Sequence, residues 1–293
     1  MQRKLVQMGK HTVMTAVPSK WVNRHNLKAG DYIEFKEDDN KLILTSTAEI
    51  YEKKTEITIK SPTVEVIWRE IQPTYTSGYD EVKINFEDKK ALKIIEQSIA
   101  NLIGFEILET GKDFVRVKSV SKQLDEEFPT ILRRVFFILK HMADVAKEGF
   151  ENKDRTRFEE IRVLEITMNR YTMFLRRTIN RTGYRYSHYM YLIISFLELT
   201  ANHLEYIRRN FNLNPKAKFS NEYSKEFVKL HDFINRVYDL YYNFNEEKFV
   251  WMAITQPHFK WFNEIKDFDI KFNFKTMTEY LVQISRMIKA LHT

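Results

Sequence analysis

Two pairs of oxygen-bearing side chains stand four residues apart in the C-terminal part of the chain. Glu165 precedes Asn169 in one long apolar-periodic segment, and Glu198 precedes Asn202 in the next. Residues four apart lie on one face of a helix, and antiparallel packing of the two helices would bring the faces together. Oxygen ligands suit hard divalent cations or iron-type carboxylate sites. Because two of the four side chains are neutral amides, the sequence predicts either a weak metal site or a polar helix face without metal.

Arginines make the same part of the chain strongly basic. The stretch 166–197, which includes Arg170, contains no carboxylate, so its arginines lack counter-ions nearby in the sequence. Such a cluster suits DNA phosphates, a phosphorylated partner or an acidic loop of a transporter, although an exposed helix C-terminus also favours cations. The residues predicted to contact a partner are Arg176, Arg177, Arg181 and Arg185.

The first 30 residues form a second cationic region, with no acidic residue before Asp31. The whole chain has a formal net charge of +7, and a one-signed segment of this kind is a candidate electrostatic footprint for nucleic acid. The alternative is a chance run of charge on a solvated face. The candidate DNA contacts are Arg3, Lys4, Lys10, His11, Lys20 and Arg24.

An enzymatic function has little support in the sequence. The chain contains no cysteine and only seven glycines, and none of the common phosphate-cradling, zinc-protease or nucleophile-elbow motifs occurs. His203 stands on the apolar stripe of its helix, where a hydrogen-bonded core histidine is a better interpretation than a ligand. We therefore expect a protein that is not an enzyme.

The composition predicts a cytoplasmic protein that folds and is not inserted into a membrane. Hydrophobic residues make up 43% of the chain and charged residues 30%, which is enough apolar material for a core. The longest apolar run, 189–197, falls far short of the roughly 20 residues that span a bilayer. The absence of cysteine excludes disulfides and gives no sign of an oxidising compartment.

The elements that must position these residues fall into three predicted regions. Residues 1–47 alternate polar and apolar side chains around a short helix at Pro18–Arg24 and end in a hairpin. A unit of this size buries too little surface to be stable alone, so we expect it to dimerise. Residues 48–120 are predicted to form a small α/β connector, with strands at 82–86, 105–107 and 115–117, a helix over 89–102 and Gly104 at its C-cap.

Residues 121–293 are predicted to be helical throughout. Apolar residues recur at spacings of three and four in six segments, and long helices joined by short links form antiparallel bundles. A break at Pro215 divides them into two three-helix halves, 121–215 and 216–293. The fifth helix, over 249–267, contains Pro257, which should end or kink it. The predicted fold class is therefore α+β multidomain.

The N-terminal region resembles the AbrB/SpoVT/MazE swapped-hairpin family. The resemblance lies in Arg3–Lys10, with its glycine at position 9, in Val17–Val22 and in Leu27–Asp31. It implies an interlocked homodimer that forms a β-barrel, whose basic strands and loops grip DNA. The sequence departs from the family at Val22 and Asn23, where the best-known DNA-binding member has paired arginines. That departure leaves room for a module that serves only in dimerisation.

The C-terminal region resembles the PhoU family of helical regulators linked to phosphate uptake. The segment Phe196–Ile207 is similar to the acidic helix motif of that family, with Asn202 where aspartate is usual, and Leu164–Arg170 is similar to its partner segment. The family implies a divalent or iron-type metal ion, weakened here by the two asparagines. The fusion of both kinds of region resembles an archaeal arrangement.

These observations predict a homodimeric DNA-binding transcriptional regulator of phosphate uptake and homeostasis with a helical sensing bundle. The alternative is a PhoU-like accessory protein that docks on a phosphate transporter or a sensor kinase and uses its N-terminal module for dimerisation only. A third hypothesis is an antitoxin of the MazE type. Such a protein is expected to have a disordered tail that wraps a toxin, whereas this sequence predicts ordered amphipathic helices.

Overall fold

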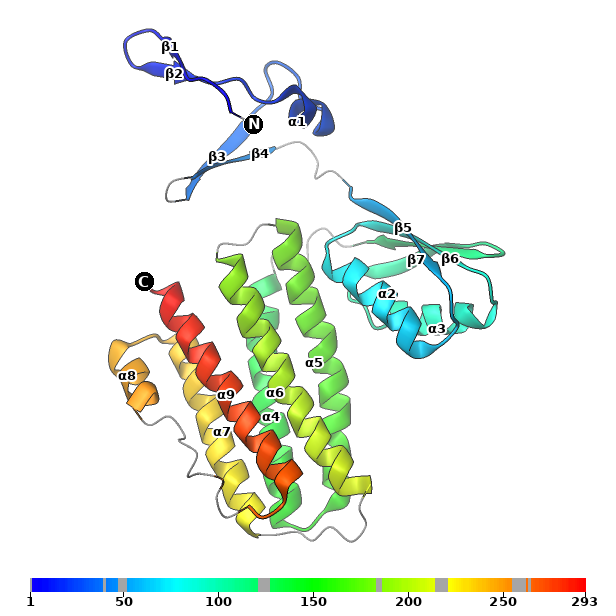
Figure 1. Cartoon of the computed structure of the whole chain (residues 1–293), viewed down its shortest axis with the longest axis vertical. Helices are drawn as coiled ribbons and strands as arrows, with labels where there is room; N and C mark the ends of the chain where they lie inside the picture. The colour runs from blue at the N-terminus through cyan, green and yellow to red at the C-terminus, as the bar shows by residue number, and fades with distance from the viewer. Residues whose placement is uncertain are drawn as a thin grey trace. The chain divides into compact units, whose positions relative to one another are not determined.

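The protein was analysed as a computed structural model, shown in Figure 1. Its chain divides into two compact units, unit 1 (Met1–Lys53) and unit 2 (Lys54–Thr293). The fold is α+β, with small sheets and a mostly helical C-terminal region, as the sequence predicts in coarse terms. No closed barrel occurs in the part of a single chain that the structure describes. The described residues are 2–38, 41–46, 52–120, 127–182, 186–213, 221–254, 262 and 265–293.

Unit 1 consists of two hairpins and one short helix. Strand β1 (Val6–Met8) pairs antiparallel with β2 (Thr12–Met14), and β3 (Ile33–Asp38) pairs antiparallel with β4 (Lys41–Ser46). Helix α1 (Ser19–Arg24) begins directly after a proline. The predicted second hairpin and short helix are confirmed, whereas β1 was not recognised as a separate strand.

The N-terminal part of unit 2 is a two-layer α/β structure. Strands β5 (Lys54–Ile59) and β6 (Glu81–Phe86) are parallel, and β8 (Phe114–Ser119) lies antiparallel between β6 and β7 (Phe105–Thr110). Helices α2 and α3 share one apolar core with one face of this sheet (Figure 1). The bounds of these helices are Val64–Thr76 and Lys90–Ile99. The predicted strands are confirmed; β5 and α2 were not predicted.

Gly104 does not cap the preceding helix, contrary to the prediction. Helix α3 ends at Ile99 with Ala100 as its C-cap. Gly104 lies in the turn that leads into β7, where its φ of +77° is a left-handed conformation that glycine adopts without steric strain. The glycine therefore shapes the entry to the strand rather than the end of the helix.

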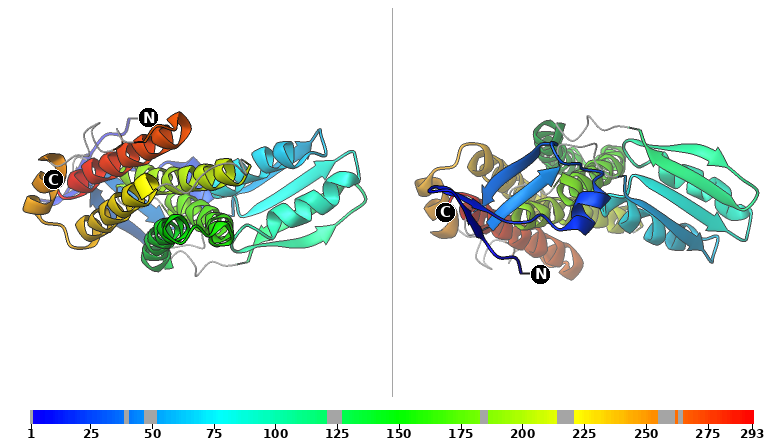
Figure 2. Two further views of the ribbon diagram at one scale, coloured as in Figure 1. Left: turned by 90° about the horizontal axis from the view of Figure 1, so that it is seen from below. Right: turned by 90° about the horizontal axis from the view of Figure 1, so that it is seen from above.

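The remainder of unit 2 is a helical bundle, which Figure 1 shows from the side and Figure 2 from its two ends. Buried residues from all of its helices belong to one apolar core. Among the described residues, no helix is long and apolar enough to cross a bilayer. The bounds of the helices are α4 (Phe128–Glu151), α5 (Arg155–Thr182), α6 (Ser187–Leu213), α7 (Asn221–Tyr242), α8 (Glu246–Ile254) and α9 (Phe268–Leu291).

Among the described residues, three helices (α4, α5 and α6) precede the predicted division at residue 215 and three (α7, α8 and α9) follow it, but the lengths in the second group differ from the prediction. Helix α8 has only nine residues, whereas α7 has 22 and α9 has 24. The helix predicted over 249–267 ends at Ile254, and Asp267 is instead the N-cap of α9, whose side chain accepts a hydrogen bond from the Ile270 amide at 3.0 Å. The predicted breaks at Pro215 and Pro257 lie outside the described residues.

Aromatic packing joins the helices on the two sides of the predicted division into one core. The Phe150 ring of α4 lies 5.0 Å from the Phe158 ring of α5, and 5.1 Å from both Phe211 of α6 and Phe227 of α7, measured between ring centroids. The Phe227 ring in turn lies 4.8 Å from Phe274 of α9. These contacts join helices from both sides of the predicted division, so the apolar side chains of the five long helices share one interior.

Candidate functional site

The predicted DNA contacts of unit 1 are all available at the surface. Each of the six side chains is exposed, and none forms a hydrogen bond or an ion pair with another described residue. Lys20 and Arg24 belong to α1, and the others lie on or beside the first hairpin. Unpaired cations on a surface are free to contact phosphate oxygens, which accept most protein–DNA hydrogen bonds.

Each hairpin of unit 1 has one apolar face. In the register of the first hairpin, Val6 pairs with Met14, and Met8 lies on the same face because it is two residues farther along the strand. In the second hairpin, Phe35 pairs with Leu44, and the same face holds Ile33 and Leu42. Val6, Met8, Phe35 and Leu42 are all more than half exposed, between 54% and 58%.

The described residues of unit 1 form no core of their own. None of its described residues is buried, although both of its hairpins present apolar faces. An isolated two-stranded hairpin is at best marginally stable in water, and additional strands or a covering layer are needed. A single copy of unit 1 is therefore incomplete as a folding unit.

A polar seam runs between α5 and α6 and contains three of the four predicted metal ligands, Glu165, Asn169 and Glu198. The fourth, Asn202, is half-buried on α6 and its side chain has no hydrogen bond to another described residue. Asn169 donates a hydrogen bond from Nδ2 to Oε1 of Glu165 at 2.5 Å. Glu198 accepts a hydrogen bond from the Thr172 hydroxyl at 2.7 Å and another from the Arg176 guanidinium. Antiparallel packing thus brings the two predicted faces together, but each carboxylate already has a partner inside the protein.

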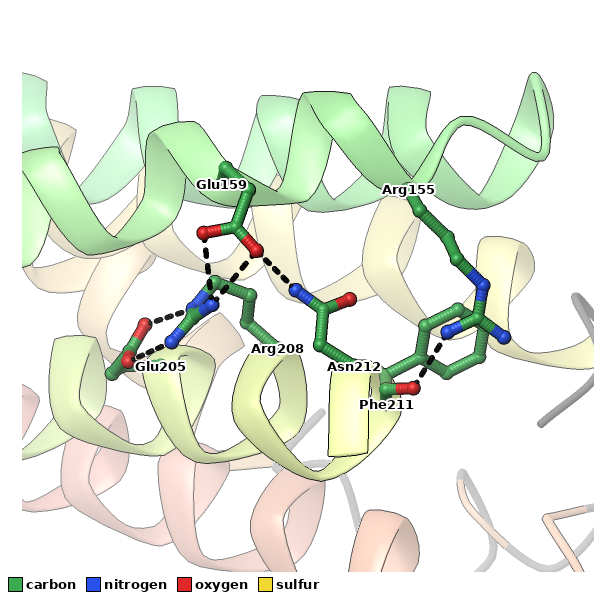
Figure 3. Close-up of polar contacts among 6 residues, drawn as sticks. All are labelled: Arg155, Glu159, Glu205, Arg208, Phe211 and Asn212. Carbon is green, nitrogen blue, oxygen red and sulfur yellow. Dashed lines mark hydrogen bonds and ion pairs between the residues drawn. The ribbon is translucent and has the colours of Figure 1, made fainter. Parts of the chain in front are cut away.

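The far end of this seam is a second ionic network, drawn in Figure 3. The guanidinium of Arg208, on α6, binds both carboxylate oxygens of Glu205 at 2.5 Å and both oxygens of Glu159, on α5, at 3.2 Å. Asn212 also donates to Glu159. At the start of α5, Arg155 donates to the main-chain oxygen of Phe211 on α6 at 2.7 Å. The side chains that join the N-terminal end of α5 to the C-terminal end of α6 are therefore Arg155, Glu159, Arg208 and Asn212.

The seam does not fit the predicted metal ion. Within the described part of the chain, no group of three or more histidine, aspartate or glutamate side chains is placed to hold a cation. Of the predicted ligands, Glu198 is neutralised by Arg176, which is only 11% exposed. Oδ1 of Asn169 is buried without a hydrogen-bond partner, but one neutral acceptor does not replace the anionic oxygens that hard cations prefer.

Glu165 titrates abnormally because of its position in the seam. Burial raises the pKa of its carboxyl above the ordinary value, and the hydrogen bond from Asn169 opposes this effect. The neighbouring carboxylates of Glu205 and Glu198 raise the pKa further, and Arg162 lowers it. Desolvation and like charge therefore both favour the neutral acid.

The arginine cluster predicted to contact a partner faces the interior instead. Arg177 is buried and donates from Nη1 to the main-chain oxygens of Tyr75 at 3.0 Å and Tyr79 at 2.6 Å. Asp80 accepts from Arg177 at 3.4 Å and forms an ion pair with Arg181 at 3.0 Å. These arginines join α5 to the α/β layer of unit 2. Arg176 is occupied by Glu198, and the fourth predicted residue, Arg185, lies outside the described residues.

His203 has the structural role that the sequence indicates. It is buried, and its Nδ1 lies 2.6 Å from Oδ1 of Asn273 on α9. The amide nitrogen of Asn273 donates to the main-chain oxygen of Asp269 at 2.7 Å, which leaves Oδ1 to face the histidine. Nδ1 therefore carries the hydrogen of this bond, and the prediction of a hydrogen-bonded core histidine is confirmed.

Sequence reasoning missed the acidic partners of the arginines. Asp80 lies 97 residues before Arg177, and Arg208 is joined to Glu159 across 49 residues. The only available signal was local: Glu205 and Arg208 are three residues apart, a spacing that places side chains together on one helix face. Ion pairs between distant segments leave no such periodic trace.

Comparisons with known proteins add nothing to these observations. No family model matches the chain, and neither the curated proteins nor the solved structures contain a significant match.

Proposed function

We propose that this protein is a homodimeric DNA-binding regulator in which unit 1 contacts DNA and unit 2 senses a signal. The observation that carries the proposal is the combination found in unit 1. The six basic side chains predicted to contact DNA are exposed and unpaired among the described residues, and the two hairpins have apolar faces without a core beneath them.

A second copy of the chain is the covering partner that we propose for the apolar faces. Pairing two copies of unit 1 would bring four hairpins together and bury Val6, Met8, Phe35 and Leu42, which are now more than half exposed. Burial of each such side chain contributes about 1.5–3 kcal/mol. A two-fold dimer would also double the basic surface and match a DNA site of two half-sites. This arrangement agrees with the swapped-hairpin resemblance of residues 1–47.

The assignment to phosphate uptake rests on the resemblance of the bundle to the PhoU family. The seam between α5 and α6 holds the two motif segments on facing helices. Because their carboxylates are bonded to Arg176 and Asn169, we propose that this bundle receives its signal without a metal ion in the seam.

The alternative function, docking on a transporter or a sensor kinase, is less well supported, because three of its four predicted contact residues are bonded inside unit 2. Arg176 and Arg177 are buried, and the side chain of the partly buried Arg181 is 5% exposed. All three are bonded within unit 2, so these side chains cannot meet an acidic loop of another protein while the fold is intact. The exposed cations of unit 1 have no such internal use, which favours DNA.

The salt dependence of DNA binding tests the proposal. We expect the full-length protein to bind duplex DNA with an affinity that falls steeply with salt, because phosphate contacts release counter-ions. Arg3→Ala and Lys10→Ala should each weaken binding and lower the slope of log K against log salt by about one unit. Fluorescence anisotropy of labelled genomic fragments measures both quantities.

Two exposed cations of unit 2 provide the matched controls. Lys93→Ala on α3 and Arg162→Ala on α5 make the same change in net charge at exposed positions, and we expect them to leave the slope unchanged. Equal effects of all four substitutions would show that net charge, and not the surface of unit 1, governs binding. Absence of DNA binding by the unmodified protein would overturn the proposed function.

A further inference from the structure

A cavity of about 400 Å³ opens between the α/β layer and the bundle of unit 2. Helices α2 and α3 form one wall, and α5 forms the other. The cavity thus lies between the two layers that Arg177 and Arg181 join, and it is open to solvent. Its volume is within the range of small-molecule sites in proteins, about 300–1,000 Å³.

The wall of the cavity is mainly apolar. Trp68 from α2, Ile94 from α3 and Met173 from α5 line it, and Met173 is buried in the core of the α/β layer. A tryptophan ring beside a methionine and an isoleucine offers contact surface for a flat or branched apolar group. Val64 and Ile166, both exposed, also line the cavity.

One cation at the cavity is without a counter-ion. Arg170 lines the cavity and is exposed, and it forms no hydrogen bond or ion pair with any other described residue. By contrast, Arg176, Arg177 and Arg181 farther along the same helix all have carboxylate partners. A free guanidinium at the mouth of an apolar cavity suits a ligand carboxylate, which it can bind through two parallel hydrogen bonds.

The polar side chains around the cavity restrict the ligand further. Gln97 and Ser98 from α3 line the cavity, as does Asn101 just after that helix, but none of them is charged. The Ser98 hydroxyl already donates to the main-chain oxygen of Ile94 at 2.8 Å.

Asn169 of α5 also lines the cavity; its amide nitrogen donates to Glu165, and its Oδ1 is buried without a hydrogen-bond partner. No carboxylate is among the described residues that line the cavity. The lining therefore combines one positive charge with an apolar interior.

We propose that this cavity is a binding site for a small carboxylate with an apolar or aromatic body. The carboxylate pairs with Arg170, and the body lies against Trp68, Ile94 and Met173. Because its walls come from both layers of unit 2, a bound ligand holds α2 and α3 to α5. The site lies wholly within unit 2, so the proposal does not depend on DNA binding.

Two probes of equal shape test the proposal. The probes are 3-phenylpropionate and its uncharged amide, which share the apolar body and differ in charge. Isothermal titration with the full-length protein should show one site per chain for the acid. We expect the amide to bind at least about tenfold more weakly, because a charge-assisted bond to Arg170 is replaced by a neutral one.

Two arginine variants test whether Arg170 is the residue that binds the carboxylate of the probe. Arg170→Gln should bind the acid and the amide with equal, weak affinity, whereas Arg162→Gln, at another exposed position of α5, should keep the preference for the acid. The melting temperatures of both variants should equal that of the unmodified protein, since both positions are exposed. Ile166→Trp should reduce the affinity for both probes, because the larger ring occupies cavity volume.

Three results would overturn the proposal. One is the absence of binding of the acid at millimolar concentration to a folded protein. Another is equal affinity of the unmodified protein for acid and amide. The third is a preference for the acid that persists in Arg170→Gln. Loss of DNA binding with intact probe binding would instead count against the proposed function and leave this site standing.

Discussion

The same residue type has opposite roles in the two units of the chain. In unit 1, Arg3 and Arg24 are exposed and have no internal partner among the described residues. In unit 2, Arg177 is 4% exposed and is bonded to two main-chain oxygens and to Asp80. A cluster of cations in a sequence therefore does not by itself identify a binding surface. What decides is whether the fold brings a distant acceptor to it.

The two units also differ in how much of each is buried in an apolar core. The described residues of unit 1 include none that is buried, whereas unit 2 holds two apolar cores. We expect substitutions in unit 1 to change association and DNA affinity, and substitutions in the interior of unit 2 to change the free energy of unfolding.

The largest expected effect is that of Arg177→Ala. Its removal leaves the Tyr75 and Tyr79 carbonyl oxygens without this donor and takes one cation from buried Asp80, so we expect a loss of about 3–5 kcal/mol in the free energy of unfolding. Urea denaturation followed by circular dichroism measures the loss. Arg24→Ala, the matched change in unit 1, should alter this free energy by less than about 0.5 kcal/mol. Equal losses would remove the distinction between the units.

Gly149→Ala should destabilise the bundle by about 1–3 kcal/mol. A Cβ atom at this position would lie 2.3 Å from Cε2 of Phe158, a ring that is fully buried in the shared core. Combining it with Phe158→Leu relieves the overlap, so the double variant should lose less than the sum of the two single losses. The free energies of unfolding of the two single variants and the double variant are measured by urea denaturation. If the two single losses simply add in the double variant, the predicted contact is contradicted.

Phe35→Ser should weaken dimerisation at least about tenfold, because it removes an apolar side chain from the face that we propose to be covered by a second copy. Sedimentation velocity over a range of concentrations measures the dissociation constant. Phe272→Ser on α9 is the matched control, since its side chain is 54% exposed and that of Phe35 is 56%. A dimer that resists the first change would show that another surface joins the copies.

The smallest expected effect concerns pH. Because the pKa of Glu165 is raised in the folded protein, its ionisation destabilises the fold as pH rises from the ordinary value of about 4.3 through the raised one. Glu165→Gln should therefore be more stable than the unmodified protein at neutral pH, and the difference should vanish below about pH 4. A difference that grew as pH fell would contradict the assigned direction. Thermal unfolding between pH 3.5 and 8 measures it.

Periodicity allowed much of the fold to be predicted. The four-and-three spacing of apolar residues located the long helices, and Val82–Phe86 alternated as a strand with one buried face does. Helix α2 was not predicted, although its buried residues Ile67, Ile71 and Tyr75 are four apart. Pro73 stands inside this segment, and a proline argues against a helix. The shared bundle core was also missed, since nothing local in the sequence shows which long helices pack together.

The candidate sites were less predictable than the elements. The six basic residues of unit 1 that were predicted to contact DNA are exposed, as expected for charged side chains. The burial of Arg176, Arg177 and Arg181 depends on Glu198 and Asp80, which come from other elements. The cavity beside Arg170 has walls from three helices and no sequence signature at all.

Helix α5 also constrains the order in which the chain acquires its structure. Met173 completes the core of the α/β layer, and Arg177 bonds to Tyr75, 102 residues earlier in the chain. During synthesis, the strands and helices of residues 54–119 leave the ribosome well before α5 exists. The part of their apolar surface that Met173 covers must then stay exposed until about 60 further residues have been made, at roughly 5–20 residues per second. The face of the α/β layer that receives Met173 and Arg177 is therefore completed only after α5 has been made.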